Sequence, residues 1–241
     1  MDLWGITHRG VVREENQDAY AIRTLSEQQL LAVVCDGMGG ARAGGLASTM
    51  AVESFLKLFE QLWSRGDLSA ENILESAAAY ANEVVHHRST TDDACFGMGT
   101  TMVAALLDAA RATILNEGDS RAYHITPDSI TRVTRDHSLV EDLVLRGDLT
   151  PEQARSHPHK NLITRALGAE AELNADVFAL DVKQEECILL CSDGLSNVVS
   201  DQEMLYEVLH GGPLENCCQR LLDIAIKRGA PDNVTVALIQ C

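Results

Sequence analysis

The chain alternates between short apolar runs and longer segments with helical spacing. Residues 30–35 (LLAVVC) form a short, continuous apolar run, which is typical of a buried strand. Residues 48–63 instead repeat apolar side chains every three or four positions, so they predict a helix with one buried face. A second helix is expected to follow Ser69, a favourable N-cap residue, and to run through His87.

Beyond residue 99 the apolar runs become short again. Three of them, at 100–107, 111–116 and 121–125, are joined by tight polar turns and predict an antiparallel meander. Because strands are grouped together and helices are grouped together, the pattern predicts an α+β layer fold rather than a doubly wound sheet. The remaining expected elements are strands at 177–180, 187–191 and 234–240 and helices at 201–210 and 214–228.

Residues 136–170 differ from the segments on either side. They are polar, and Gly, Pro and His residues interrupt short helical pieces. We therefore expect a mobile subregion here rather than part of the core. A length of 241 residues allows two domains or one large domain with an insertion.

The composition is strongly acidic, since 19 Lys and Arg residues face 36 Asp and Glu residues and leave a net charge of −17. Nucleic acids and anionic membranes are polyanions, so neither is expected as a partner. Apolar runs fall short of the ~20 residues that cross a bilayer, and residues 1–5 lack the features of a secretory signal. With seven cysteines but no CxxC pair, we expect a reduced cytoplasmic protein without membrane insertion, and without coiled-coil heptads we expect a monomer.

Aspartates recur at the ends of the expected strands, usually beside glycine or another small residue. A single Asp-Gly pair is typical of a turn. If several strand ends met, however, two carboxylates 4 Å apart would repel by up to ~4 kcal/mol at an effective dielectric constant near 20, and cations or protonation would relieve this. Because no His or Cys joins the pattern, an oxygen-only ligand set would favour Mg²⁺ or Mn²⁺. These aspartates are Asp18, Asp36, Asp119, Asp193 and Asp232.

Eight motifs follow one another along the chain: REENQDA (13–19), VCDGMGG (34–40), GMGTT (97–101), NEGDSRAY (116–123), TRDHSL (134–139), LITRALG (162–168), CSDGL (191–195) and APDNVT (230–235). In this order they resemble the motifs of the bacterial PPM-type (type 2C) serine/threonine protein phosphatases. The resemblance implies an α+β fold with four αββα layers, in which two central antiparallel sheets are flanked by helix pairs. It also implies a single domain over residues 1–241 with a flap at about 136–170.

The resemblance assigns a metal site to the strand-end aspartates. Asp36 would bridge two Mn²⁺ or Mg²⁺ ions, and Gly37 would offer its carbonyl oxygen. Asp193 and Asp232 would complete one of these ions. Asp119, together with Asp193, matches the third metal site of bacterial members.

Two further residues would complete the catalytic machinery. Arg13 would bind the substrate phosphate with its planar guanidinium, and Asp18 would hold metal-bound water. By the same resemblance, the reaction is hydrolysis of phosphoserine and phosphothreonine in proteins by a water or hydroxide that bridges the two ions, without a phosphoenzyme. The expected partners are phosphorylated proteins, including a bacterial Ser/Thr kinase that the enzyme would oppose.

Two alternatives stay open. A non-catalytic regulatory module on the same fold would be indicated by loss of the metal aspartates, but Asp36, Asp193 and Asp232 are all present. An acidic cation-binding protein without catalysis would explain the carboxylates but neither Arg13 nor the order of the motifs. Met38 stands where eukaryotic members carry histidine, so the sequence assigns no general acid.

Overall fold

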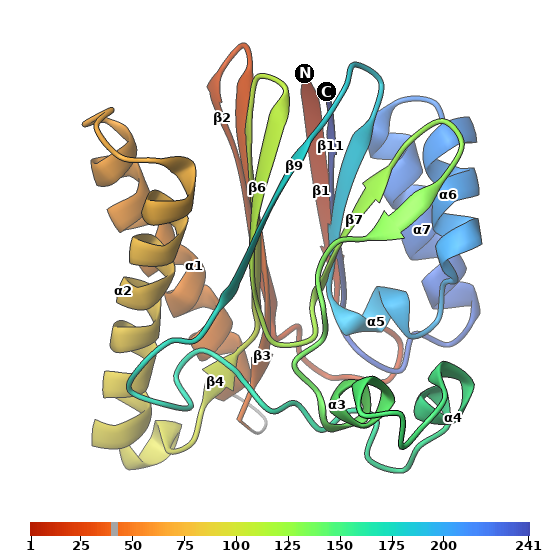
Figure 1. Cartoon of the computed structure of the whole chain (residues 1–241). Coiled ribbons are helices and arrows are strands. Elements are labelled where there is room, and N and C mark those ends of the chain that lie inside the picture. The colour runs from red at the N-terminus through yellow and green to blue at the C-terminus, as the bar shows by residue number, and fades with distance from the viewer. Residues whose placement is uncertain (40–42) are drawn as a thin grey trace.

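The computed structural model describes residues 1–39 and 43–241 and has the expected four layers. Two antiparallel sheets pack face to face, α1 and α2 cover the outer face of one, and α6 and α7 cover the outer face of the other (Figure 1). The strands are β1 (Asp2–His8), β2 (Asp18–Ser26), β3 (Gln29–Met38), β4 (Gly99–Thr100), β5 (Met102–Asp108), β6 (Arg111–Glu117), β7 (Arg121–Ile125), β8 (Ile130–Arg132), β9 (Asp176–Asp181), β10 (Cys187–Cys191) and β11 (Val234–Gln240). The helices are α1 (Ala43–Trp63), α2 (Ala70–Thr91), α3 (Leu139–Leu145), α4 (Pro151–Arg155), α5 (Asp193–Ser196), α6 (Asp201–His210) and α7 (Leu214–Lys227), with a 3₁₀ turn at Asp93–Cys95.

The first and last strands of the chain lie side by side. One sheet has the order β1-β11-β10-β7-β8, and the other has the order β2-β3-β5-β6-β9 with β4 paired to β3. Strand β1 pairs with β11 from Asp2 opposite Gln240 to His8 opposite Val234. The loop that leaves β1 and the loop that enters β11 therefore meet at one end of the sandwich.

The apolar core has three parts because successive side chains of a strand point to opposite faces of the sheet. Leu30 and Val34 of β3 lie between the two sheets, whereas Leu31 and Val33 pack against α1 and α2. On the other sheet, Leu189 faces α6 and α7. Both faces of these strands are buried, which explains why residues 30–35 form a continuous apolar run rather than an alternating one.

The two N-terminal helices agree with the sequence pattern except at their ends. Helix α1 begins at Ala43 rather than at residue 48. Ser69 is the N-cap of α2, as predicted, and its Oγ accepts a hydrogen bond from the N–H of Asn72 at 3.3 Å. Helix α2 then continues to Thr91, four residues beyond the expected end.

The predicted meander is wrong in its third strand. Strands β5 and β6 pair as expected, but β7 lies in the other sheet between β10 and β8. Residues 118–120 form the short turn that carries the chain from one sheet to the other. This crossing places Asp119 at the end of the sandwich, between the two sheets.

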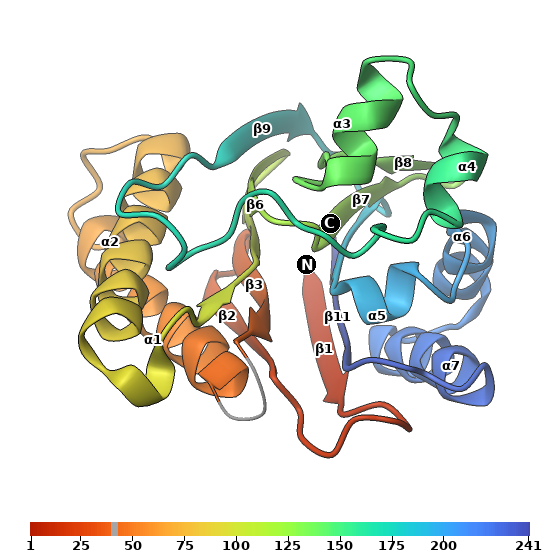
Figure 2. The same cartoon turned by 90° about the horizontal axis from the view of Figure 1, so that it is seen from below.

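Residues 136–170 contain the short helices α3 and α4, in agreement with the expected helical pieces. Figure 2 looks onto this end of the sheets and shows α3 beside β8 and α5 beside β11. The ends of the segment are anchored, since residues 136–138 and 166–167 are buried. The expected mobility applies only to its exposed middle part and stays a prediction.

The seven cysteines are all free thiols, and all but Cys241 are buried. Among the helices in residues 1–39 and 43–241, none is both long and apolar enough to span a bilayer.

Candidate metal centre

A cleft of about 540 Å³ opens at the end of the sandwich where β3, β6 and β10 finish and β11 begins. It brings together six of the seven predicted site residues, whereas Asp18 lies outside its wall. Four of the five strand-end carboxylates therefore line one cleft, as the resemblance implied. The wall consists of Arg13, Glu14, Glu15, Gln17, Asp36, Gly37, Met38, Gly39, Thr101, Asp119, Asn161, Ile163, Asp193, Asp232 and Asn233.

Asp36 has a fixed backbone and a crowded carboxyl group. Its N–H donates to Thr101 Oγ1 at 2.9 Å, and its carbonyl oxygen accepts from Thr100 Oγ1 at 2.9 Å. Burial raises the pKa of this carboxyl well above its usual range, and the negative charges of Asp18, Asp193, Asp119 and Asp232 raise it further. A divalent cation would remove this electrostatic penalty.

Asp18 stands behind Asp36, opposite it in the pairing of β2 with β3. Its Oδ2 accepts hydrogen bonds from Ser192 Oγ at 2.8 Å and from Thr235 Oγ1 at 2.6 Å. Its Oδ1 is buried without a hydrogen-bond partner. Burial raises the pKa of Asp18 to about 7, although the two hydroxyl groups oppose the rise.

Asp119 and Asp193 face the cleft from different elements. Burial, and then the charge of Asp193, raise the pKa of Asp119 to about 8. Burial and the charge of Asp232 likewise raise the pKa of Asp193. Asp193 Oδ2 accepts from Asn197 Nδ2 at 2.9 Å, but its Oδ1 is buried and unpartnered.

Arg13 reaches the cleft from the loop that follows β1. Its Nη2 donates to Asp232 Oδ2 at 2.7 Å, and its side chain is 55% exposed, so it can still contact a ligand. The loop is held by Asn233, whose Nδ2 donates to the carbonyl oxygens of Arg9 at 2.8 Å and Glu15 at 2.9 Å. Asn233 is thus a site residue to which the sequence assigned no role, although it lies in the APDNVT motif.

The wall also contains residues to which the sequence assigned no role. Glu14 and Glu15 lie beside Arg13, and Asn161 and Ile163 come from the segment after α4. Only the folded chain brings these positions, nearly 150 residues apart, to one cleft.

The residues fit a hard divalent cation. Asp18 Oδ1 and Asp193 Oδ1 are buried acceptors without partners, and the neighbouring carboxyl groups have raised pKa values because they are buried together. Within residues 1–39 and 43–241, no three imidazole, thiol or carboxyl groups already stand in an arrangement that could hold a metal ion. Asp232 instead bonds Arg13, so side-chain rotation would accompany cation binding.

Gly37 lies where the backbone of the cleft is tightest. Its N–H donates to the carbonyl oxygen of Gln17 at 3.1 Å. A Cβ on Gly37 would collide with the carbonyl oxygen of Gly44 at the start of α1. A Cβ on Gly44 would in turn lie 2.7 Å from the Gly37 carbonyl oxygen, so both positions require glycine.

Replacing Gly44 with alanine should therefore push the Gly37 carbonyl out of place and lower the free energy of unfolding by about 1–3 kcal/mol. Gly45→Ala is the matched control, since its Cβ would have no heavy atom closer than 3.6 Å and should leave stability within about 1 kcal/mol. Thermal unfolding and Mn²⁺ titration of both variants give the measurement. Equal behaviour of the two variants would contradict the close approach of α1 to Gly37.

Comparison with known proteins finds relatives over nearly the whole chain. A family model described as Protein phosphatase 2C matches residues 7–225. The serine/threonine phosphatase stp of Listeria innocua is 36% identical over 239 residues, which cover 97% of this chain and 93% of the relative. The solved structure of Stp1 from Staphylococcus aureus has 35% identity and a TM-score of 0.89 over 100% of this chain and 94% of its own.

A second solved structure, the catalytic domain of the phosphatase PstP in complex with two manganese ions, has 31% identity and a TM-score of 0.83. It covers 98% of this chain and 96% of its own. The chain belongs to the protein phosphatase 2C family, a class of metal-dependent enzymes. Its activity is that of a serine/threonine protein phosphatase, so its substrates are phosphorylated proteins.

Proposed function

We propose that this cleft hydrolyses phosphoserine and phosphothreonine with Mn²⁺ or Mg²⁺ ions held by its aspartates. Asp36, the Gly37 carbonyl oxygen, Asp193 and Asp232 would hold two ions, and Asp119 together with Asp193 would hold a third. This proposal rests on the crowding of buried carboxyl groups. Burial and the negative charges of neighbouring carboxylates raise the pKa values of Asp36 and Asp119. Such a cluster is unfavourable unless cations or protons neutralise it.

The bound ions would lower the pKa of a water molecule and offset the negative charge of the phosphate. Arg13 lies at the mouth of the cleft, where its guanidinium can bind two phosphate oxygens at once. Asp18 keeps one oxygen fixed by two hydroxyl groups and one oxygen unpaired. We assign the unpaired oxygen to orienting the attacking water.

We favour direct attack by water over a phosphoenzyme, because the aspartates of the wall, which could themselves act as nucleophiles, are assigned to the cations. Among the described residues that line the cleft there is no Cys, Ser or His. The hydroxyl group of Thr101 is already engaged, since it accepts from the Asp36 N–H at 2.9 Å and lies 2.7 Å from Ser120 Oγ. A regulatory module without catalysis would not require buried carboxyl groups that repel one another.

We further propose that the physiological partners include a serine/threonine kinase whose products this enzyme dephosphorylates. The bacterial relatives named above are protein phosphatases, and the charge of −17 disfavours polyanionic partners. The free thiols support a cytoplasmic location, and a monomer is the expected state. The whole chain, 1–241, would act as one catalytic domain, with residues 136–170 as a flap that contributes Asn161 and Ile163 to the cleft.

The test is hydrolysis of a phosphothreonine peptide in Mn²⁺, in Mg²⁺ and in EDTA. Release of phosphate should require the metal, and the protein should carry no covalent phosphate after rapid quenching with acid. A matched phosphotyrosine peptide serves as the control for substrate class. Absence of turnover in both metals would overturn the catalytic proposal in favour of a regulatory module, and a trapped phosphoenzyme would overturn direct attack by water.

A further inference from the structure

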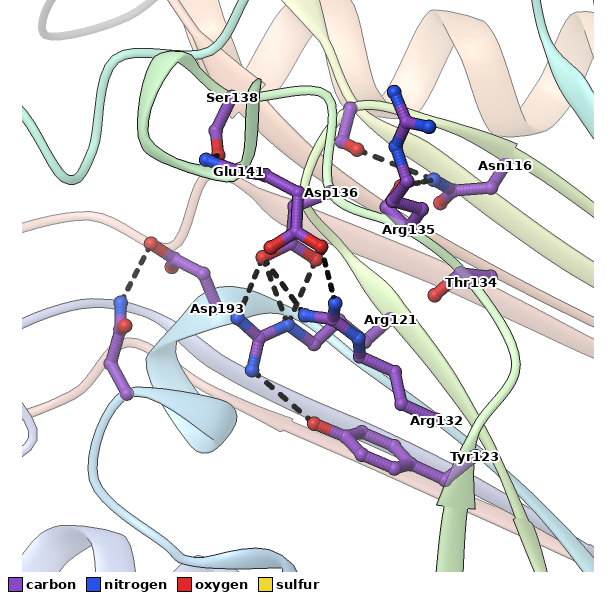
Figure 3. Close-up of polar contacts among 12 residues, drawn as sticks. Asn116, Arg121, Tyr123, Arg132, Thr134, Arg135, Asp136, Ser138, Glu141 and Asp193 are labelled. Carbon is purple, nitrogen blue, oxygen red and sulfur yellow. Dashed lines mark hydrogen bonds and ion pairs between the residues drawn. The ribbon is translucent and has the colours of Figure 1, made fainter. Parts of the chain in front are cut away.

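A chain of ion pairs runs from β7 to helix α3, close to the cleft residue Asp193 (Figure 3). Arg121 of β7 donates from Nε to Asp136 Oδ1 at 2.9 Å and from Nη2 to Asp136 Oδ2 at 2.6 Å. Arg132 of β8 lies 3.6 Å from the same Asp136 Oδ2 and donates to Glu141 Oε1 of α3 at 2.6 Å. Two positive charges thus alternate with two negative charges, and the group is neutral as a whole.

The guanidinium of Arg121 is also held on its other side. Its Nη1 donates to the hydroxyl group of Tyr123 at 3.3 Å, and Tyr123 is fully buried. Burial opposes the charge of Arg121, but the hydrogen bonds and the charge of Asp136 more than offset it, so the pKa of Arg121 is raised. Arg121 therefore stays positively charged, and its contacts with Asp136 and Tyr123 fix the orientation of its guanidinium group.

This fixed charge lies next to two carboxyl groups of the cleft. Figure 3 shows Asp193 beside Arg121, and the charge of Arg121 lowers the pKa values of Asp193 and Asp119 against the larger effects of burial. Asp193 Oδ1 is a buried acceptor without a partner. If Arg121 lost its partner Asp136, this free oxygen would be a favourable new acceptor for the guanidinium, because a buried charge without a partner is costly.

We propose that Asp136 is a positioning residue that keeps Arg121 directed away from Asp193 and Asp119 and so leaves their oxygens available to divalent cations. The inference rests on the assignment of Asp193 and Asp119 as metal ligands under the proposed function. In it, Asp136 touches neither metal nor substrate, and its contact with Arg121 carries the positioning effect, beside the direct effect of its charge, which raises the pKa of Asp119.

The test is calorimetric titration of the purified full chain with Mn²⁺. Asp136→Asn should weaken Mn²⁺ binding by about tenfold or more, the range seen when a group that orients a metal ligand is removed. The double variant Arg121→Gln/Asp136→Asn should recover affinity to within about threefold of the wild type, because the competing guanidinium is gone. A merely structural role predicts the opposite, namely a further loss in the double variant.

Glu141→Gln is the matched control, since it removes a charge from the same chain of ion pairs but leaves Arg121 and Asp136 in contact. The Mn²⁺ affinity of this variant should stay within about twofold of wild type.

Tyr123→Phe releases the other side of the guanidinium without changing any charge and should weaken Mn²⁺ binding, as Asp136→Asn does. If Asp136→Asn does not fold, unchanged affinity in Tyr123→Phe overturns the inference. Wild-type protein that binds no Mn²⁺ overturns the proposed function, whereas equal binding by wild type and Asp136→Asn overturns only this inference.

Discussion

Replacing Asp36 with asparagine should lower kcat for a phosphothreonine peptide by more than about a hundredfold. Loss of a group that merely orients a metal ligand costs 10–100-fold, and Asp36 is assigned to both core ions, so its effect should be larger. Steady-state kinetics in saturating Mn²⁺ give kcat, and calorimetry gives the loss of bound metal. Asn keeps the size of the side chain and can make the same backbone contacts, so a large effect would report the lost charge.

Asp128→Asn is the matched control for this substitution. Asp128 lies exposed in the turn between β7 and β8, so the same change of charge there should leave kcat unaltered. Asp36→Asn should also stabilise the protein in EDTA near neutral pH, because folding then no longer requires this position to bind a proton or bury a charge. Retention of full activity by Asp36→Asn would show that the site is wrongly assigned even if the enzyme is a phosphatase.

The second large effect is on stability in a metal-chelating buffer. Raising the pH from 5 to 8 in EDTA should lower the melting temperature by at least about 5–10 °C. The pKa of Asp18 is raised by burial to about 7, so the folded state holds a proton that the unfolded state has already lost above pH 4. Its contribution to stability is complete below the unfolded pKa and is lost as the pH rises through 7.

The size of the expected loss of stability follows from the pH interval between 5 and the pKa of Asp18, which is about 7. Two pH units at 1.36 kcal/mol each give about 3 kcal/mol for Asp18. Each 1 kcal/mol shifts the melting temperature by about 2–4 °C at this chain length, so Asp18 alone accounts for the 5–10 °C. Asp119, with a pKa of about 8, adds a contribution of the same sign, so this shift is a minimum. Mn²⁺ added at pH 8 should restore the lost stability, because cations replace the protons.

Thermal unfolding from pH 5 to 8, with EDTA and with Mn²⁺, is the measurement. Asp36→Asn should flatten the pH dependence in EDTA, since one source of repulsion is removed, whereas Asp128→Asn should follow the wild type. A melting temperature in EDTA that rises steadily from pH 5 to 8 would contradict the raised pKa values.

The candidate site was largely predictable because its chemistry is concentrated in short motifs. Asp36-Gly37 and Asp193-Gly194 each combine a carboxylate with a glycine whose position leaves no space for a side chain. A Cβ on Gly194 would collide with the carbonyl oxygen of Asn233, as a Cβ on Gly37 would with that of Gly44. The link from Arg121 to Asp136 was not predictable. It joins positions 15 residues apart, and although both residues lie in the quoted motifs, neither motif indicates that the two side chains are in contact.

The fold was predictable where burial leaves a simple pattern. Strands β1 and β2 were missed because their exposed and partly buried positions follow neither strict alternation nor an apolar run. The change of sheet after β6 was missed because residues 118–120 have the composition of an ordinary hairpin turn. Which sheet β7 joins depends instead on its pairing with β10, more than 60 residues later.

Because β1 and β11 are neighbours in one sheet, the site depends on strands from both ends of residues 1–241. Arg13 and Asp232, which are bonded to each other, lie 219 residues apart in the sequence. Contacts of such separation form late, after the chain entropy of a long loop has been lost. The cleft is therefore assembled only when the last strand enters the sheet, and a nascent or prematurely terminated chain has no phosphatase site, however much of its core has folded.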